Sequence, residues 1–258
     1  NDTFYTDTLF SKVKSMNSNT CAQVYSNGSF TKVFPMPDKT GARVGQTLTD
    51  FADDVGIPDT LVMDLAPEQA GKHTEMQKEA RRLRVRIRFT EKGRSEQNHT
   101  AEGEIGQLKR RWKHQMTTKN VPRCLWDYGL VHEAEVLSIL ARGKDQVPGL
   151  EKVLGQTIDI SEYLDFGIWD LVWYWDQSKT SDMSDEQKKL GRWLGIAHRV
   201  GSEMTYWILT EHCKVIARST VQHVLFADLQ QETVKAKAVR FEQLIDENIR
   251  GRETIVNV

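Results

Sequence analysis

Three carboxylate residues occupy positions where an acidic side chain is costly unless a cation binds it. Asp7 interrupts an apolar segment with the composition of a strand, and Asp64 ends a second such segment. Glu102 stands near the start of a segment with helical spacing. Carboxylates are the ligands of hard cations such as Mg²⁺ or Mn²⁺, and two such ions can stabilise the attacking and leaving oxygens in phosphoryl transfer. Asp7, Asp64 and Glu102 are therefore candidates for a two-metal catalytic site, although strand periodicity alone does not select them.

Two of these carboxylates, Asp64 and Glu102, also have a purely structural interpretation. An aspartate at the end of a strand, such as Asp64, is typical of a turn or a helix cap. Glu102 lies in a first helical turn, where the helix macrodipole favours an acid. Glu104 is the nearest competitor, but it lies about 200° around the helix from Glu102. Glu102 is therefore the better candidate of the two.

The segments that must position these residues alternate between strand and helix patterns. Short runs rich in β-branched and aromatic residues predict strands, and apolar residues spaced by three and four predict helices. The predicted strands are residues 4–10, 20–25, 30–36, 60–63 and 85–89. The predicted helices are residues 42–55, 76–83, 101–112 and 125–140. This order indicates an α/β domain with a mixed sheet and flanking helices, and it is also the order of the ribonuclease-H-like fold.

The chain changes character after a turn-rich stretch that ends near residue 160. Tryptophans recur there in short alternating runs, including Trp169, Trp173 and Trp175. Such runs predict a small antiparallel β-barrel. We therefore expect three parts: a catalytic core over 1–150, a barrel over 160–225, and a polar helical or flexible tail over 226–258.

Composition excludes several classes of protein. The 258 residues are 39% hydrophobic and 28% charged, which suits a packed globular chain. No apolar run approaches the roughly 18–20 residues that span a bilayer, and only three cysteines are present, without a Cys-x-x-Cys pair. We expect an intracellular protein with neither a disulfide framework nor a membrane association. The net charge of −1 hides basic clusters over 81–94 and 109–123, where a polyanion could bind.

The three acids resemble the Asp, Asp, Glu triad of integrases of long-terminal-repeat elements. In that family the Glu follows Asn by four residues in a Pro-x-x-Asn-Gly-x-x-Glu run, and Asn98 and Glu102 match this spacing. The departures from the family pattern are Leu65 and Ala66 in place of Asn-Gly after the second Asp, Ser95 in place of Pro, and His99 in place of Gly. The resemblance implies a ribonuclease-H-like fold and a catalytic site of Asp7, Asp64 and Glu102 that holds two Mg²⁺ or Mn²⁺ ions.

Segments outside the triad are similar to the pattern that follows the core in copia-type elements. These segments are Leu125-Trp126, residues 148–155, Ile160, Phe166-Gly167, and residues 192–195 and 215–224. The resemblance implies element-end DNA and host target DNA as partners, a homo-oligomer, and residence in a virus-like particle and the nucleus. The chain lacks an initiating Met, so we expect a piece of a longer polyprotein whose zinc domain lies upstream.

A basic helix face next to Glu102 predicts where DNA would run. Lys109 and Lys113 share a face with Glu102 by four-then-three spacing, opposite the apolar stripe of the same helix. We expect DNA contacts from Asn98, Lys109, Arg110 and Lys113. A run of lysine and arginine is also typical of a merely solvated helix face.

Two other functions stay open at the level of sequence. A ribonuclease-H-type nuclease would share the fold, but its early helix supplies a Glu, whereas residues 42–55 offer only Asp50, Asp53 and Asp54. A degenerate integrase copy would bind DNA without catalysis, and the departures at Leu65, Ala66 and His99 motivate that alternative. Strand-transfer activity separates the three functions.

Overall fold

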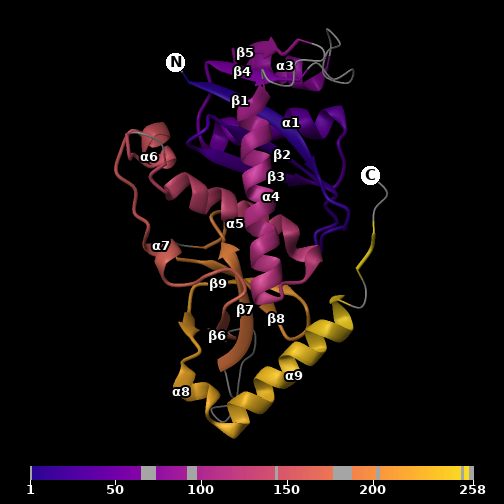
Figure 1. The fold of residues 1–258 in the computed structure, drawn as a ribbon, viewed down its shortest axis with the longest axis vertical. Helices are drawn as coiled ribbons and strands as arrows, with labels where there is room; N and C mark the ends of the chain where they lie inside the picture. The colour runs from indigo at the N-terminus through magenta and orange to yellow at the C-terminus, as the bar shows by residue number, and fades with distance from the viewer. Residues whose placement is uncertain are drawn as a thin grey trace. The chain divides into compact units, whose positions relative to one another are not determined.

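The structure is a computed structural model that describes residues 2–64, 74–91, 98–142, 145–176, 188–201, 204–250 and 253–255. The chain forms two compact units (Figure 1). The first unit comprises Asn1–His114, Glu133–Ile158 and Ile255–Val258. The second comprises Gln115–His132 and Asp159–Thr254. Residues 115–132 thus belong with the C-terminal part of the chain, although they precede part of the first unit in sequence.

A five-stranded mixed sheet with the order β3-β2-β1-β4-β5 forms the centre of the first unit. β1 is antiparallel to β2, and β2 to β3, whereas β1, β4 and β5 run parallel. The bounds are β1 Thr3–Phe10, β2 Cys21–Ser26, β3 Thr31–Met36, β4 Thr60–Met63 and β5 Arg86–Phe89. This mixed sheet confirms the predicted α/β architecture. Parallel strands need helical connections, and these helices cover the faces of the sheet.

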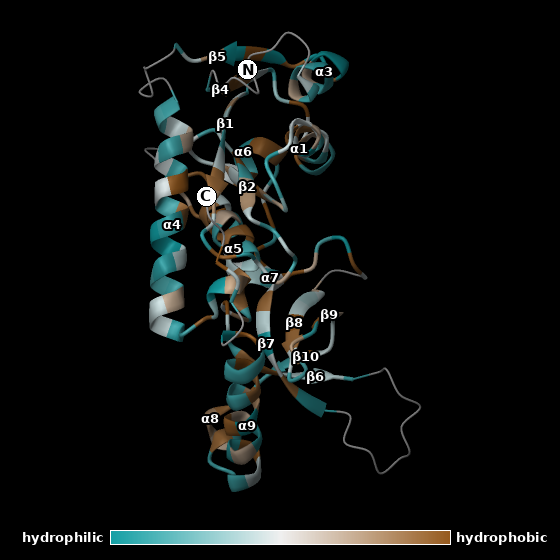
Figure 2. Cartoon of the chain, turned by 90° about the vertical axis from the view of Figure 1, so that its right-hand side faces the viewer, coloured by the Kyte–Doolittle hydropathy of each residue, from teal (hydrophilic) through white to brown (hydrophobic). Residues whose placement is uncertain are grey.

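Helices lie on both faces of this sheet. Figure 2 shows α1 and α3 on one side and α4 on the other. The helices with residues in this unit are α1 Gly41–Asp54, α3 Glu75–Arg82, α4 His99–Lys119, α5 Trp126–Ile139 and α6 Gly149–Leu154. The 3₁₀ turn η2 Arg123–Leu125 and the short helix α7 Ser161–Leu164 belong to the second unit. Each predicted helix and strand of this part corresponds to an observed element, and the helix predicted over 101–112 is longer than predicted, since α4 extends over His99–Lys119. Period-two and period-3.6 patterns locate such elements because one face of each is buried.

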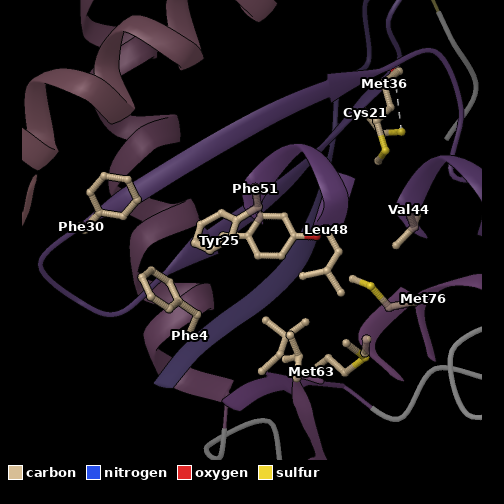
Figure 3. Packing of buried hydrophobic residues seen from close by; sticks show 13 residues of the cluster. Phe4, Cys21, Tyr25, Phe30, Met36, Val44, Leu48, Phe51, Met63 and Met76 are labelled. Carbon is tan, nitrogen blue, oxygen red and sulfur yellow. Dashed lines mark hydrogen bonds between the residues drawn. The ribbon is translucent and has the colours of Figure 1, made fainter. Parts of the chain in front are cut away.

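Aromatic rings form the centre of the core between the sheet and α1. Phe51 of α1 stacks on Tyr25 of β2 at 4.8 Å and meets Phe4 of β1 edge to face at 4.9 Å. Figure 3 shows these rings beside Leu48 and Met63. The Tyr25 hydroxyl and the Thr47 hydroxyl lie 2.8 Å apart, so the polar end of the ring is satisfied. Full burial of one such side chain contributes roughly 1.5–3 kcal/mol.

The second unit contains a five-stranded antiparallel sheet with the order β10-β6-β7-β8-β9. Its strands are β6 Leu171–Trp175, β7 Lys188–Ile196, β8 Tyr206–Thr210, β9 Val215–Arg218 and β10 Val221–His223. The predicted antiparallel strands are present, but closure into a barrel is not confirmed. Closure requires the two edge strands, β10 and β9, to pair with each other. Within the described residues β10 pairs only with β6, and β9 only with β8. The sheet is therefore open.

Two helices follow the second sheet, α8 Phe226–Leu229 and α9 Glu232–Asn248. Phe241 and Ile245 of α9 are buried, and Glu242 accepts hydrogen bonds from Arg192 of β7 at 2.6 and 3.0 Å. α9 is thus attached to the sheet of its unit by an apolar stripe and an ion pair. Across the described ranges, no helix combines the length and the apolar character that crossing a bilayer requires.

Candidate active site

Asp7 and Asp64 lie side by side because β1 and β4 are parallel neighbours. The register pairs Phe4 with Leu61 and Thr6 with Met63, and each aspartate comes one residue later. Successive side chains of a strand alternate between faces, so both aspartates point away from the face on which Phe4 and Met63 enter the core. Two carboxylates that are distant in the sequence therefore meet on one face of the sheet.

The carboxylate of each aspartate is oriented by a neighbouring donor. The backbone N–H of Thr8 donates to Asp7 Oδ1 at 2.7 Å. The hydroxyl of Thr90 donates to Asp64 Oδ1 at 2.9 Å. Thr90 follows Phe89, which is paired with Met63, so the β4–β5 register itself brings Thr90 beside Asp64. Thr90 is a site residue that was not predicted, although its place directly after a strand was a signal for it.

Asn98 attaches the start of α4 to β1. Its side-chain amide donates to the Thr6 carbonyl oxygen at 3.4 Å, and the residue is fully buried. The DNA contact of Asn98 stays a prediction, and in this structure its side chain is buried against β1. The four-residue spacing from Asn98 to Glu102 corresponds to one turn of α4, which begins beside the buried Asn98. One helical turn after Asn98, Glu102 is exposed on the first turn of α4.

The charges of the three acids influence one another. Burial raises the pKa of Asp7, the Thr8 N–H lowers it, and the negative charges of Asp64 and Glu102 raise it again. The positive charge of Lys39 lowers the pKa of Asp7. A half-buried carboxylate beside two like charges costs free energy in its ionised form. A cation at this position would offset that cost.

The side chains do not already surround one common point. Among the residues that the structure describes, no group of three His, Cys, Asp or Glu side chains lies close enough to hold a metal ion. Asp7 and Asp64 are directed by their donors, whereas Glu102 is exposed. The chemistry of the donor set fits a hard divalent cation.

Removing the charge of Asp7 should stabilise the metal-free fold at neutral pH. A raised folded-state pKa means that ionisation of Asp7 costs stability above that pKa, and that this cost is absent below the pKa of an unfolded aspartate, about 3.9. We expect Asp7→Asn to raise the Tm at pH 7 in a chelating buffer. A gain of 1 kcal/mol in unfolding free energy corresponds to a rise in Tm of roughly 2–4 °C. Thermal melts between pH 3 and pH 8 should show the gain shrink as the pH falls. A variant less stable than the parent at pH 7 contradicts this expectation.

The basic residues expected to contact DNA lie on the exposed side of α4. Lys109, Arg110 and Lys113 are all exposed, whereas Ala101 and Leu108 of the predicted apolar stripe are fully buried. The helix therefore separates a basic face from a core face as its spacing predicts.

Asp54 and Glu104 have partners of their own away from this site. Asp54, from the helix considered for a nuclease, forms an ion pair with Lys32 at 3.2 Å. Glu104 is buried and paired with Arg142. Leu65, Ala66 and Ser95, where the chain departs from the integrase pattern, lie outside the described residues.

No protein-family model and no curated protein matches the chain. Among solved structures, a chain of the simian T-cell lymphotropic virus intasome in complex with PP2A regulatory subunit B56 gamma is similar, with a TM-score of 0.48 and 14% identity over 87% of this chain and 79% of that chain. The catalytic core domain of BIV integrase is similar with a TM-score of 0.44 and 14% identity, over 60% of this chain and 94% of that chain. Likeness at this identity concerns the arrangement of elements and not the chemistry of a site.

Proposed function

We propose that this chain is a polynucleotidyl transferase of the integrase type, which joins element DNA ends to target DNA with divalent metal ions. One observation carries the proposal. Asp7 and Asp64 adjoin on one face of two parallel strands, and the charge of Glu102 acts on Asp7. A structural ion pair alone does not explain this arrangement, because three negative charges gather there beside one positive charge, that of Lys39. Clustered like charges are typical of sites that bind a cation.

Asp7, Asp64 and Glu102 would hold two Mg²⁺ or Mn²⁺ ions. When bound, these ions would supply stabilisation of the charge on the attacking and leaving oxygens of a phosphodiester. The chain's own residues orient the ligands. Thr90 holds the Asp64 carboxylate, the Thr8 N–H holds that of Asp7, and Glu102 lies one turn beyond the buried anchor Asn98.

The exposed basic face of α4 is the proposed path of the DNA backbone. Lys109, Arg110 and Lys113 continue along the helix that begins beside the carboxylates. Lysine and arginine contacts to phosphates position a duplex without reading its sequence. The proposed partners are the element ends and the target DNA, and the proposed working state is a homo-oligomer.

The finer assignment is to the copia type of long-terminal-repeat element, with a ribonuclease-H-like core. The mixed sheet of the first unit and its flanking helices support the fold. The spacing of Asn98 and Glu102 and the segments after the core support the family.

A DNA-binding protein without catalysis is the second candidate. It is favoured by the absence, within the described ranges, of any three-residue group ready to hold a metal ion. Such a protein would keep the basic face of α4 and lose only the chemistry.

Strand transfer by the unmodified chain tests the proposal. The substrate is a pre-cut element-end duplex with a recessed 3′ hydroxyl, and the target is a supercoiled plasmid, in Mg²⁺ or Mn²⁺. Covalent joining that a chelator abolishes is the expected result. If DNA binding has a steep salt dependence and neither metal supports joining, the non-catalytic candidate is correct.

A further inference from the structure

A buried ion pair joins α4 to the segment that follows α5. Arg142 Nη1 donates to both carboxylate oxygens of Glu104, at 3.0 and 3.1 Å. The side chains of Arg142 and Glu104 are only 18% and 10% exposed. The hydroxyl of Thr31 on β3 donates to Glu104 Oε2 at 3.0 Å. Glu104 is thus held from two sides by groups with fixed directions.

Arg142 reaches a second helix position and a backbone turn. Its Nη1 also donates to Gln107 Oε1 at 3.2 Å, and its Nη2 donates to the Ser29 carbonyl oxygen at 2.9 Å. Ser29 lies in the turn between β2 and β3. One guanidinium group therefore connects two turns of α4 to the sheet.

This attachment is poorly explained by stability alone. Arg142 Nε is buried without a hydrogen-bond partner in the part of the chain that the structure describes. Two charges have also been removed from water, and an apolar pair of similar volume is often as stable as a buried ion pair. The charge-assisted hydrogen bonds from Arg142 Nη1 to the two Glu104 oxygens add what an apolar pair lacks, a defined direction.

The helix geometry shows what that direction fixes. Successive residues of an α-helix turn by about 100°, so Glu102 and Glu104 lie on opposite flanks of the buried stripe of Ala101 and Ile105. Asn98 fixes the start of α4 on β1, and Glu104 fixes one flank toward β3. With both attachments made, the flank of Glu102 lies on the other side of the helix, and the charge of Glu102 acts on Asp7.

We propose that the Glu104–Arg142 pair positions Glu102 by fixing the rotation of α4 about its axis. The proposal rests on the proposed function, because it assigns Glu102 to a metal site. Glu104 and Arg142 are positioning residues that do not touch the metal ions. Loss of their pair would remove the attachment of the helix flank opposite Glu102, which would let the first turns of α4 rotate slightly, and small misplacements of a ligand are costly.

Titration of the protein with MnCl₂ by isothermal calorimetry tests this role without any assay of activity. The double variant Glu104→Leu with Arg142→Met replaces the ion pair by an apolar pair, which avoids an uncompensated buried charge. Arg111→Met with Glu133→Leu is the matched control. That pair also attaches α4, at 2.5 Å with Glu133 only 1% exposed, but it lies about two and a half turns beyond Glu102. Arg142→Lys keeps the charge and one donor group.

We expect the Glu104–Arg142 double variant to bind Mn²⁺ about tenfold or more weakly, as variants of residues that orient metal ligands do. The control should keep the affinity of the parent, and Arg142→Lys should recover part of the loss. Where the double variant does not fold, Arg142→Lys alone should bind Mn²⁺ more weakly than the control. Parental affinity in the double variant, or an equal loss in the control, overturns the positioning role and leaves the proposed function standing. A parent that binds no Mn²⁺ overturns both.

Discussion

Glu102→Gln is expected to abolish strand transfer, by on the order of 10³-fold or more, while DNA binding and the fold persist. A neutral amide has the volume of the carboxylate but cannot supply the negative charge that a second cation requires. Glu102 is exposed in the first turn of α4, so its replacement disturbs no packing. Joining of a labelled element-end duplex to plasmid, measured beside filter binding of the same duplex, separates the two effects.

Glu75→Gln is the matched control for this substitution. Glu75 is also a first-turn acid, on α3, and its ion pair with Lys78 is exposed. Both variants lose a favourable interaction with the helix macrodipole, worth roughly 0.3–1 kcal/mol. Only Glu102→Gln should lose strand transfer. Undiminished joining by Glu102→Gln would remove Glu102 from the set of metal ligands.

Gly149→Ala is expected to cost about 2–3 kcal/mol of unfolding free energy. A Cβ at Gly149 would overlap the Ser29 carbonyl group and lie 2.6 Å from Phe30 N. These are backbone atoms, so no side chain can rotate aside. The Ser29 carbonyl oxygen also accepts the hydrogen bond from Arg142, which restrains the turn further. Urea unfolding followed by tryptophan fluorescence measures the loss.

Gly103→Ala makes the same chemical change in an open position. A Cβ at Gly103 meets no atom within 4 Å, and the residue lies within α4. Alanine favours helix over glycine, so this variant should gain roughly 0.5–1 kcal/mol. Equal stability of Gly149→Ala and the parent would show that the close approach of Gly149 to Ser29 is not required.

Local patterns in the sequence were sufficient to predict most elements of the first unit. Residues 4–10 are rich in β-branched and aromatic residues because one face of β1 enters the core, and the apolar spacing over 42–55 follows the buried side of α1. The exposed basic face of α4 follows from the same logic. Local patterns were not sufficient to predict whether the second sheet closes into a barrel. Alternation is the same in an open sheet and in a barrel, and only the pairing of the two edge strands distinguishes them.

The types and spacing of Asp7, Asp64 and Glu102 marked them as candidates, but their proximity is a property of the tertiary structure alone. It depends on the parallel pairing of β1 with β4 and on the crossing of α4 over the sheet, which join residues far apart in the chain. Burial also separated residues that look alike in the sequence. Asn98 is buried against β1, and Glu104 is buried in an ion pair with Arg142. Which residues surround a polar side chain determines its role, and these neighbours are distant in the sequence, so no local pattern predicts them.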